Sequence, residues 1–354
     1  MTSPWQPGQL LFAGFEGTVL PRELGTLIGQ GRIGGVILFT RNLESPRQVA
    51  DLVTRIRRLA PPSAPLTIAI DQEGGRVQRL KDPWTRWPPM RRLGDVDDVA
   101  LTEALASALA LELTQMGIGL NFAPVLDVDT NPDNPVIGDR SFSRDVDRVC
   151  RHGVAMVERL QALHIAACAK HFPGHGDTYL DSHKALPRLP HDLQRLRQVE
   201  LPPFVAAAKA GVAAMMSAHV VFEAVDPKRP GTLSPAVMNL LREEVGFDGL
   251  VFSDDLEMKA IADNYSPKDF VTGALQAGVD SLLVCRKLDV VTEVLARLEA
   301  LPDSTVERAV ERMVAFKERF PPPPLWNGGD LPNPPYPEHQ ALAQRIADGI
   351  PISR

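Results

Sequence analysis

The sequence predicts an α/β protein folded as one (β/α)8 barrel of the TIM type, and three observations support this prediction. Short apolar runs suited to buried strands alternate with amphipathic helical stretches along the chain. There are eight such runs, the number that this closed barrel requires. Polar residues follow several of the runs, at the strand ends where barrels of this type place their active sites.

The eight runs are apolar almost without interruption, which is typical of parallel strands buried on both faces. They lie at 9–15, 34–39, 66–70, 120–128, 166–172, 213–222, 250–255 and 281–285. Amphipathic stretches at 45–59, 100–117 and 144–163 predict helices between them. A doubly wound open sheet is the alternative, but no GxGxxG motif follows the first run.

The last part of the chain differs from the rest in composition. Residues 321–339 read PPPPLWNGGDLPNPPYPEH and precede a short helical pattern, QALAQRIADGI. Such proline-rich segments are extended and either wrap a domain or project into solvent. We therefore expect a catalytic barrel over residues 1–320 and a Pro-rich C-terminal tail with a short helix over 321–354.

Composition narrows the function classes. The 354 residues carry a net charge of −6, which argues against a nucleic-acid binder because such proteins present a basic surface. Three widely spaced cysteines indicate neither a disulfide framework nor a cysteine zinc site. The first residues lack a signal-peptide pattern, and no run approaches the roughly 18 apolar residues that span a bilayer. We expect a soluble cytoplasmic protein with no membrane or nucleic-acid partner.

Two motifs place carboxylates at strand ends. In DQEGGRVQRL, Asp71 ends a strand and Arg79 follows in the next loop, a combination suited to binding vicinal hydroxyls. The alternative is a structural loop whose charges pair with each other. In VFSDDLEM, strand neighbours point to opposite faces, so only one of Asp254 and Asp255 is expected to face the barrel axis. That residue suits a nucleophile or an electrostatic stabiliser, unless both aspartates only cap a helix.

The stretch KHFPGHGDTYLDSH, residues 170–183, is dense in histidine and aspartate. Its proline and glycines exclude a helix, so it is not a helical zinc motif, although loop histidines can still bind metal. The order of residues favours acid/base chemistry instead. Lys170 and His171 leave a strand end, whereas Asp181 and His183 follow a Gly/Pro-rich segment, where the carboxylate can orient the imidazole.

These motifs resemble those of glycoside hydrolase family 3 β-N-acetylglucosaminidases. The resemblance covers about residues 8–320. The motifs are similar in particular to those of the single-domain cytoplasmic enzymes of bacterial peptidoglycan recycling. The motifs that carry it are, in order, GRIGGVILFTRN, DQEGGRVQRL, NFAPVLDVD, IGDRSFS, KHFPGHGDTYLDSH, MMSAHVVFEAVDP, TLSPAVM and VFSDDLEM.

The resemblance implies a role for each candidate residue. Asp254 corresponds to the nucleophile of a two-step retaining mechanism, and Asp181 with His183 to an Asp–His acid/base pair on the loop after the fifth strand. The residues implied to bind the N-acetylglucosamine ring are Asp71, Arg79, Arg140, Lys170 and His171. His175 and Asp177 would shape the loop and Asp255 would accept backbone hydrogen bonds, with no metal and no cofactor.

The implied function is removal of terminal N-acetylglucosamine from muropeptides that carry 1,6-anhydro-N-acetylmuramic acid, by a monomeric enzyme. Two other enzymatic functions stay open, a phosphorylase in which phosphate attacks the intermediate and a β-glycosidase of broader specificity. A carbohydrate-binding barrel without activity is the non-enzymatic alternative, and intact nucleophile and acid/base positions argue against it.

Overall fold

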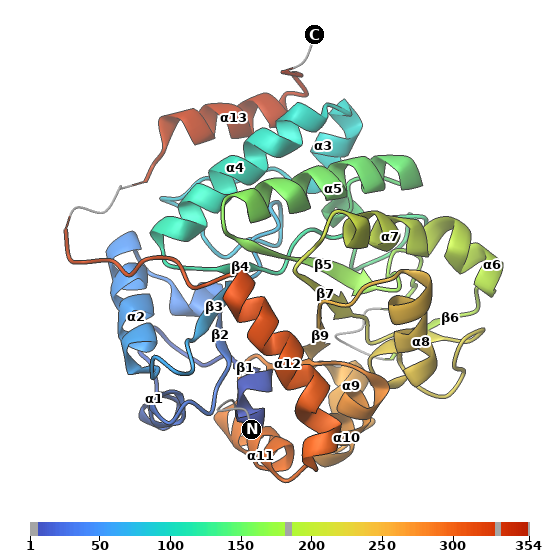
Figure 1. Cartoon of the computed structure of the whole chain (residues 1–354). Coiled ribbons are helices and arrows are strands. Elements are labelled where there is room, and N and C mark those ends of the chain that lie inside the picture. The colour runs from blue at the N-terminus through green and yellow to red at the C-terminus, as the bar shows by residue number, and fades with distance from the viewer. Residues whose placement is uncertain (1–5, 181–185, 330–333, 353–354) are drawn as a thin grey trace.

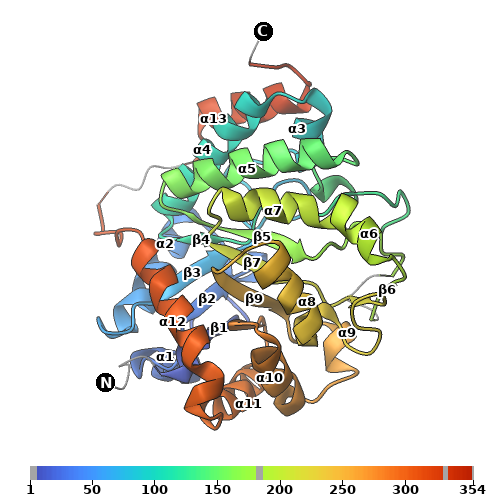
Figure 2. The same cartoon turned by 45° about the vertical axis from the view of Figure 1, so that its right-hand side comes forward.

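The computed structural model describes residues 6–180, 186–329 and 334–352, and its centre is a closed barrel of eight parallel strands (Figures 1 and 2). The strands are β1 (Leu11–Ala13), β2 (Gly35–Leu38), β3 (Thr67–Ile70), β4 (Leu120–Asn121), β5 (Ala166–Phe172), β7 (Ala214–Ser217), β9 (Leu250–Asp255) and β10 (Ser281–Val284). Each lies within one of the eight apolar runs, so the predicted (β/α)8 fold is confirmed.

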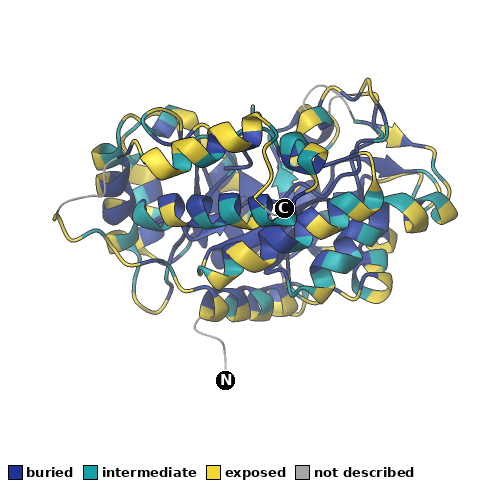
Figure 3. Ribbon diagram, turned by 90° about the horizontal axis from the view of Figure 1, so that it is seen from above, coloured by how far each residue is buried: buried dark blue, intermediate teal, exposed yellow. Residues whose placement is uncertain are grey.

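Helices surround the barrel, and most of them have one buried side (Figure 3). They are α1 (Arg22–Gly29), α2 (Pro46–Leu59), α3 (Met90–Val96), α4 (Val99–Gln115), α5 (Val146–Ala162), α6 (Leu193–Arg195), α7 (Leu201–Lys209), α8 (Pro235–Asn239), α9 (Lys259–Ala262), α10 (Pro267–Ala277), α11 (Leu288–Glu299), α12 (Asp303–Arg319) and α13 (Pro337–Ala347). Local signals set their starts. Ser45 caps α2 by accepting the N–H of Gln48, and Asp145 caps α5 by accepting that of Arg148.

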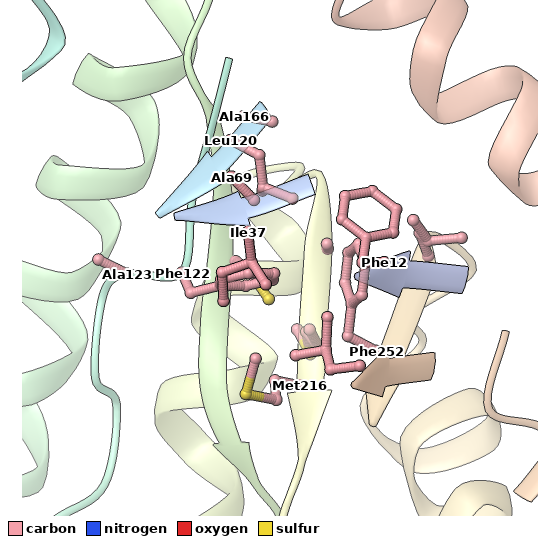
Figure 4. Close-up of a cluster of buried hydrophobic side chains, with 14 of the residues drawn as sticks. Phe12, Ile37, Ala69, Leu120, Phe122, Ala123, Ala166, Met216 and Phe252 are labelled. Atoms are coloured by element: carbon pink, nitrogen blue, oxygen red, sulfur yellow. The ribbon is translucent and has the colours of Figure 1, made fainter. Parts of the chain in front are cut away.

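Apolar side chains, including those of Phe12, Phe122 and Phe252, fill the barrel interior (Figure 4). The ring of Phe252 on β9 makes edge-on contacts with Phe12 and Phe122, at centroid distances of 5.0 and 5.3 Å. All three side chains are fully buried. Edge-to-face packing of this kind is the favoured geometry for aromatic pairs, and it makes the barrel a solid support for the strand ends.

A buried lysine closes the amino-terminal end of the barrel. Lys317 on α12 donates hydrogen bonds from Nζ to the side-chain Oε1 of Gln9 and to the carbonyl oxygens of Gly34 and Pro65, at 2.7 to 2.8 Å. These three acceptors precede β1, β2 and β3. Burial lowers the pKa of Lys317 to about 7. The last barrel helix is thereby fixed to the end opposite the strand carboxyl termini.

Two features were not predicted from the sequence. A small parallel sheet joins β6 (Arg188–Leu189) to β8 (Val221–Phe222). A short helix was expected in the C-terminal tail, but the packing of this helix, α13, against α4 and α3 was not (Figure 1). The division of the chain at residue 320 into barrel and tail stays a prediction. Among the described residues, no helix has the length and apolar character needed to cross a membrane.

Candidate active site

A cavity of about 160 Å³ opens at the carboxyl ends of the strands. Six of the eight predicted site residues line it, namely Asp71, Arg79, Arg140, Lys170, His171 and Asp254. They come from β5, β9 and the loops after β3 and β4. Asp181 and His183, the other two, lie outside the described residues. The barrel thus brings together side chains that are up to 183 positions apart in the sequence, from Asp71 to Asp254.

Lys170 lies between two carboxylates. Its Nζ is 2.9 Å from Oδ1 of Asp71 and 2.6 Å from Oε1 of Glu73. The other oxygen of Asp71, Oδ2, accepts a hydrogen bond from Arg79 at 3.1 Å. Burial opposes the charge on Asp71, but the neighbouring Lys170 and Arg79 outweigh it and hold the pKa of that carboxyl well below its usual range. Asp71 is therefore ionised throughout the physiological range.

Glu73 is a site residue that the sequence analysis missed. It is buried, and Arg140 binds both of its oxygens, through Nε at 2.8 Å and Nη2 at 2.9 Å. Burial would raise its pKa, but the charges of Arg140 and Lys170 lower it to about 2. The sequence feature that could have identified Glu73 is its position, two residues after Asp71 and directly before the two glycines.

Another carboxylate, that of Asp127, orients the histidines of the KHFPGH segment. Asp127, which follows β4, accepts a hydrogen bond from Nδ1 of His171 at 2.7 Å and backbone N–H groups from His171 and His175 at 3.2 and 2.7 Å. This contact fixes the tautomer and the orientation of the His171 ring. Burial, together with the charge of His171, lowers the pKa of His175 to about 4, so His175 is neutral near pH 7.

Asp254 and Asp255 both line the cavity, whereas strict strand alternation predicted that only one of them would face it. The register between β9 and β10 shifts between Ser281 and Leu283, and this irregularity at the end of β9 breaks the alternation. Asp255 accepts N–H groups from Glu257 and Cys285 through Oδ1. Burial, with the nearby charges of Glu257 and Asp254, raises the pKa of Asp255 to about 7.

The segment that carries the DTYLDSH motif is anchored at both of its described ends. Oδ2 of Asp177 lies 2.5 Å from Nε2 of His191, which precedes α6, and Oδ1 accepts a hydrogen bond from Thr130 at 2.8 Å. The carbonyl of Thr178 accepts a hydrogen bond from the side-chain amide of Asn131. Asp177 therefore shapes this loop, as the sequence analysis inferred.

Within the described part of the chain, no group of three or more His, Cys, Asp or Glu side chains is arranged to hold a metal ion. The histidines of the KHFPGH segment bond instead to Asp127 and Thr178. The cavity combines the strand-end carboxylate of Asp254 with a set of paired charges that can form several hydrogen bonds to a polyhydroxylated ligand.

Comparison with known proteins agrees with this geometry. The model of the glycosyl hydrolase family 3 N-terminal domain matches residues 8–316. The chain belongs to glycoside hydrolase family 3. A β-hexosaminidase of Nitrosomonas eutropha is 39% identical over 295 residues, which cover 82% of this chain and 84% of that protein. The protein is accordingly a glycosidase of the β-hexosaminidase type.

Two solved structures are also similar to this family 3 chain. A β-N-acetylglucosaminidase from Paenibacillus sp. str. FPU-7 matches with a TM-score of 0.92 and 40% identity, covering 99% of this chain and 69% of that one. NagZ from Neisseria gonorrhoeae in complex with N-trifluoroacetyl-D-glucosamine matches with a TM-score of 0.78 and 32% identity, covering 96% and 97% of the two chains.

Proposed function

We propose that the protein is an exo-acting, retaining β-N-acetylglucosaminidase that hydrolyses terminal β-linked N-acetylglucosamine. The observation that carries the proposal is the placement of Asp254 in the same cavity as the ion-paired residues Asp71 and Arg79 and the Lys170–Glu73–Arg140 network. The β-N-acetylglucosaminidase from Paenibacillus and the sugar-bound NagZ structure support the same glycone.

In the first proposed step, the carboxylate of Asp254 attacks the anomeric carbon and the bond to the leaving oxygen breaks. His183 donates a proton to that oxygen, with Asp181 orienting its imidazole. In the second step His183 removes a proton from water, whose oxygen attacks the anomeric carbon and releases Asp254 as a carboxylate. The assignment of Asp181 and His183 rests on their Asp-x-His motif, since both lie outside the described residues.

The paired charges serve as the proposed sugar-binding set. Asp71 and Arg79 present a carboxylate and a guanidinium already held at 3.1 Å, so their orientation needs little adjustment when a sugar binds. Lys170, Arg140 and His171 are buried and fixed by Glu73 and Asp127. Preorganised groups of this kind lower the entropic cost of binding a flexible, polar ligand.

Trapping tests the nucleophile. A 5-fluoro N-acetylglucosaminyl fluoride slows both steps by destabilising the oxocarbenium-like transition state, while fluoride leaves easily. We expect the glycosyl adduct to be found by peptide mass spectrometry on Asp254 and not on Asp255. An adduct on another residue, or inversion of the anomeric centre in the first product seen by NMR, would exclude the proposed mechanism.

The natural substrate is proposed on the resemblance to peptidoglycan-recycling enzymes: GlcNAc-1,6-anhydro-MurNAc peptides, cleaved by a monomer in the cytoplasm. The test compares kcat/KM for these muropeptides with that for chitobiose. A preference for chitobiose would contradict the muropeptide proposal but not the glycosidase. Running the assay with and without phosphate separates hydrolysis from phosphorolysis, because only a phosphorylase releases the sugar 1-phosphate.

A further inference from the structure

The C-terminal segment is part of the folded molecule although the family match ends at residue 316. The helix α13 lies beside α4 and α3 in both views of the barrel (Figures 1 and 2). Its residues Ala343 and Ile346 are buried. After the helix, the backbone N–H of Ile352 donates to Oδ2 of Asp98 at 2.6 Å. The segment is thus fixed by both apolar packing and hydrogen bonds.

One buried carboxylate joins this helix to the loop after β3. Glu112 on α4 is fully buried, and its Oε1 lies 2.7 Å from Nδ1 of His339 on α13. The same oxygen accepts a hydrogen bond from the hydroxyl of Thr85 at 2.6 Å. Thr85 belongs to the loop between β3 and α3, the loop that also carries Asp71 and Arg79. A change at His339 therefore alters the partner that holds Thr85.

Trp87 provides a second connection between α13 and the loop after β3. Its ring centroid is 5.9 Å from that of His339, and its side chain is buried. Its carbonyl accepts the N–H of Gly75 at 2.9 Å, in the turn directly after Glu73. The turn has little room to shift, because a Cβ at Gly74 would lie 2.7 Å from the carbonyl oxygen of Pro88. Movement of the indole is therefore transmitted to the backbone next to Glu73.

We propose that α13 is a positioning element for the glycone-binding loop and that His339 is its positioning residue. The helix does not line the cavity. It acts through Glu112 and Trp87 on the loop that presents Asp71, Glu73 and Arg79. The sugar-binding consequence rests on the proposed function, whereas the physical coupling of helix to loop does not.

Amide hydrogen exchange tests the coupling without reference to activity. The proteins compared are the wild type, a chain ending at Asn327, His339→Ala and His339→Gln. The matched control is Gln340→Ala, an exposed neighbour on the same helix. We expect amides of residues 72–89 to exchange at least about fivefold faster in the truncated chain and in His339→Ala, because local opening becomes easier.

Two comparisons make the exchange experiment specific. In His339→Gln we expect the slow exchange of residues 72–89 to be retained, since the glutamine amide can donate to Glu112. In Gln340→Ala we expect these residues to exchange at the wild-type rate. Residues 214–223, which are far from α13 in the chain, serve as the internal reference. Unchanged exchange of residues 72–89 in both the truncated chain and His339→Ala would overturn the coupling.

Kinetics then test the positioning role on proteins shown to be folded by circular dichroism. We expect KM for an aryl β-N-acetylglucosaminide and the inhibition constant of free N-acetylglucosamine to rise about tenfold in His339→Ala, with kcat little changed, since uniform binding is lost. Faster exchange with unchanged KM and inhibition constant would overturn the positioning role. A wild-type protein without activity would overturn the proposed function instead, while the exchange result would still decide the coupling.

Discussion

Arg140 binds the carboxylate of Glu73 through two nitrogens, Nε at 2.8 Å and Nη2 at 2.9 Å, and both side chains are at least 90% buried. A bidentate pair in this environment is both strong and directional. It fixes the loop after β4 to the loop after β3, and Lys170 adds β5 to the same carboxylate. Three separate segments therefore depend on Glu73 for their relative positions in the cavity.

Replacing Glu73 with glutamine should destabilise the protein and weaken sugar binding. The change leaves Arg140 and Lys170 buried with one fewer compensating charge, so we expect the free energy of unfolding to fall by about 3 kcal/mol. Urea unfolding measures this change, and KM for an aryl N-acetylglucosaminide should rise.

The control is Glu299→Gln, which breaks the bidentate pair between Glu299 and Arg32. Both of these side chains are about one-third exposed, so we expect the free energy of unfolding to fall by less than about 1 kcal/mol. Equal losses in both variants would contradict the role given to Glu73.

Asp255 should make the stability of the protein depend on pH. Its pKa is raised from 3.8 to about 7 in the folded state, chiefly by burial. The folded state therefore binds more protons than the unfolded state between pH 4 and 7. The stabilising contribution is fully present below pH 4 and is lost as the pH rises through 7, a change of a few kcal/mol.

Comparison with Asp255→Asn isolates this effect. The amide oxygen can still accept the N–H groups of Glu257 and Cys285 but does not titrate. His175, with its pKa lowered to about 4, contributes the opposite dependence, but equally in both proteins. We expect the unfolding free energy of the variant, relative to the wild type, to increase from pH 4 to pH 7.5. A constant difference across this range would show that Asp255 does not titrate there.

The sequence predicted the barrel well because each buried strand is marked by its own local apolar run. It also identified six of the residues that line the cavity, because strand ends and motifs are local features. Glu73 was missed because its importance depends on Lys170 and Arg140, which come from distant strands and loops. The docking of His339 on Glu112 was missed for the same reason, since 227 positions separate the two residues. Long-range pairing of buried charges leaves no pattern in a single sequence.

Asp254→Ala should abolish turnover without unfolding the protein. The side chain lies at the end of β9 and is half-buried, so its loss removes the attacking carboxylate without opening the aromatic core. We expect kcat for an aryl N-acetylglucosaminide to fall by at least about a thousandfold. Thermal unfolding followed by circular dichroism serves as the control and should change little. A folded variant that retains near-normal activity would remove Asp254 as the nucleophile.

The contact between Asp177 and His191 should contribute measurably to stability, because it joins both described ends of the loop. A double-mutant cycle with Asp177→Ala and His191→Ala is expected to give a coupling energy of about 1–2 kcal/mol, as is typical of hydrogen bonds to charged groups. The exposed pair of Arg47 and Asp51 on α2 is the matched comparison, with expected coupling below about 0.5 kcal/mol. Additive losses at Asp177 and His191 would mean that the contact does not hold the loop ends together.

Replacing His183 with alanine should slow hydrolysis by an amount that depends on the leaving group. A proton donor is needed most when the departing oxygen is a poor leaving group, so we expect a loss of about 100- to 10,000-fold for alkyl or sugar aglycones. For a dinitrophenyl aglycone, which departs without protonation, the first step should be nearly unaffected in a pre-steady-state burst. Azide, as a nucleophile that needs no general base, should accelerate the second step in the variant and yield the β-glycosyl azide. Equal losses for all leaving groups, with no response to azide, would assign the proton transfer to a residue other than His183.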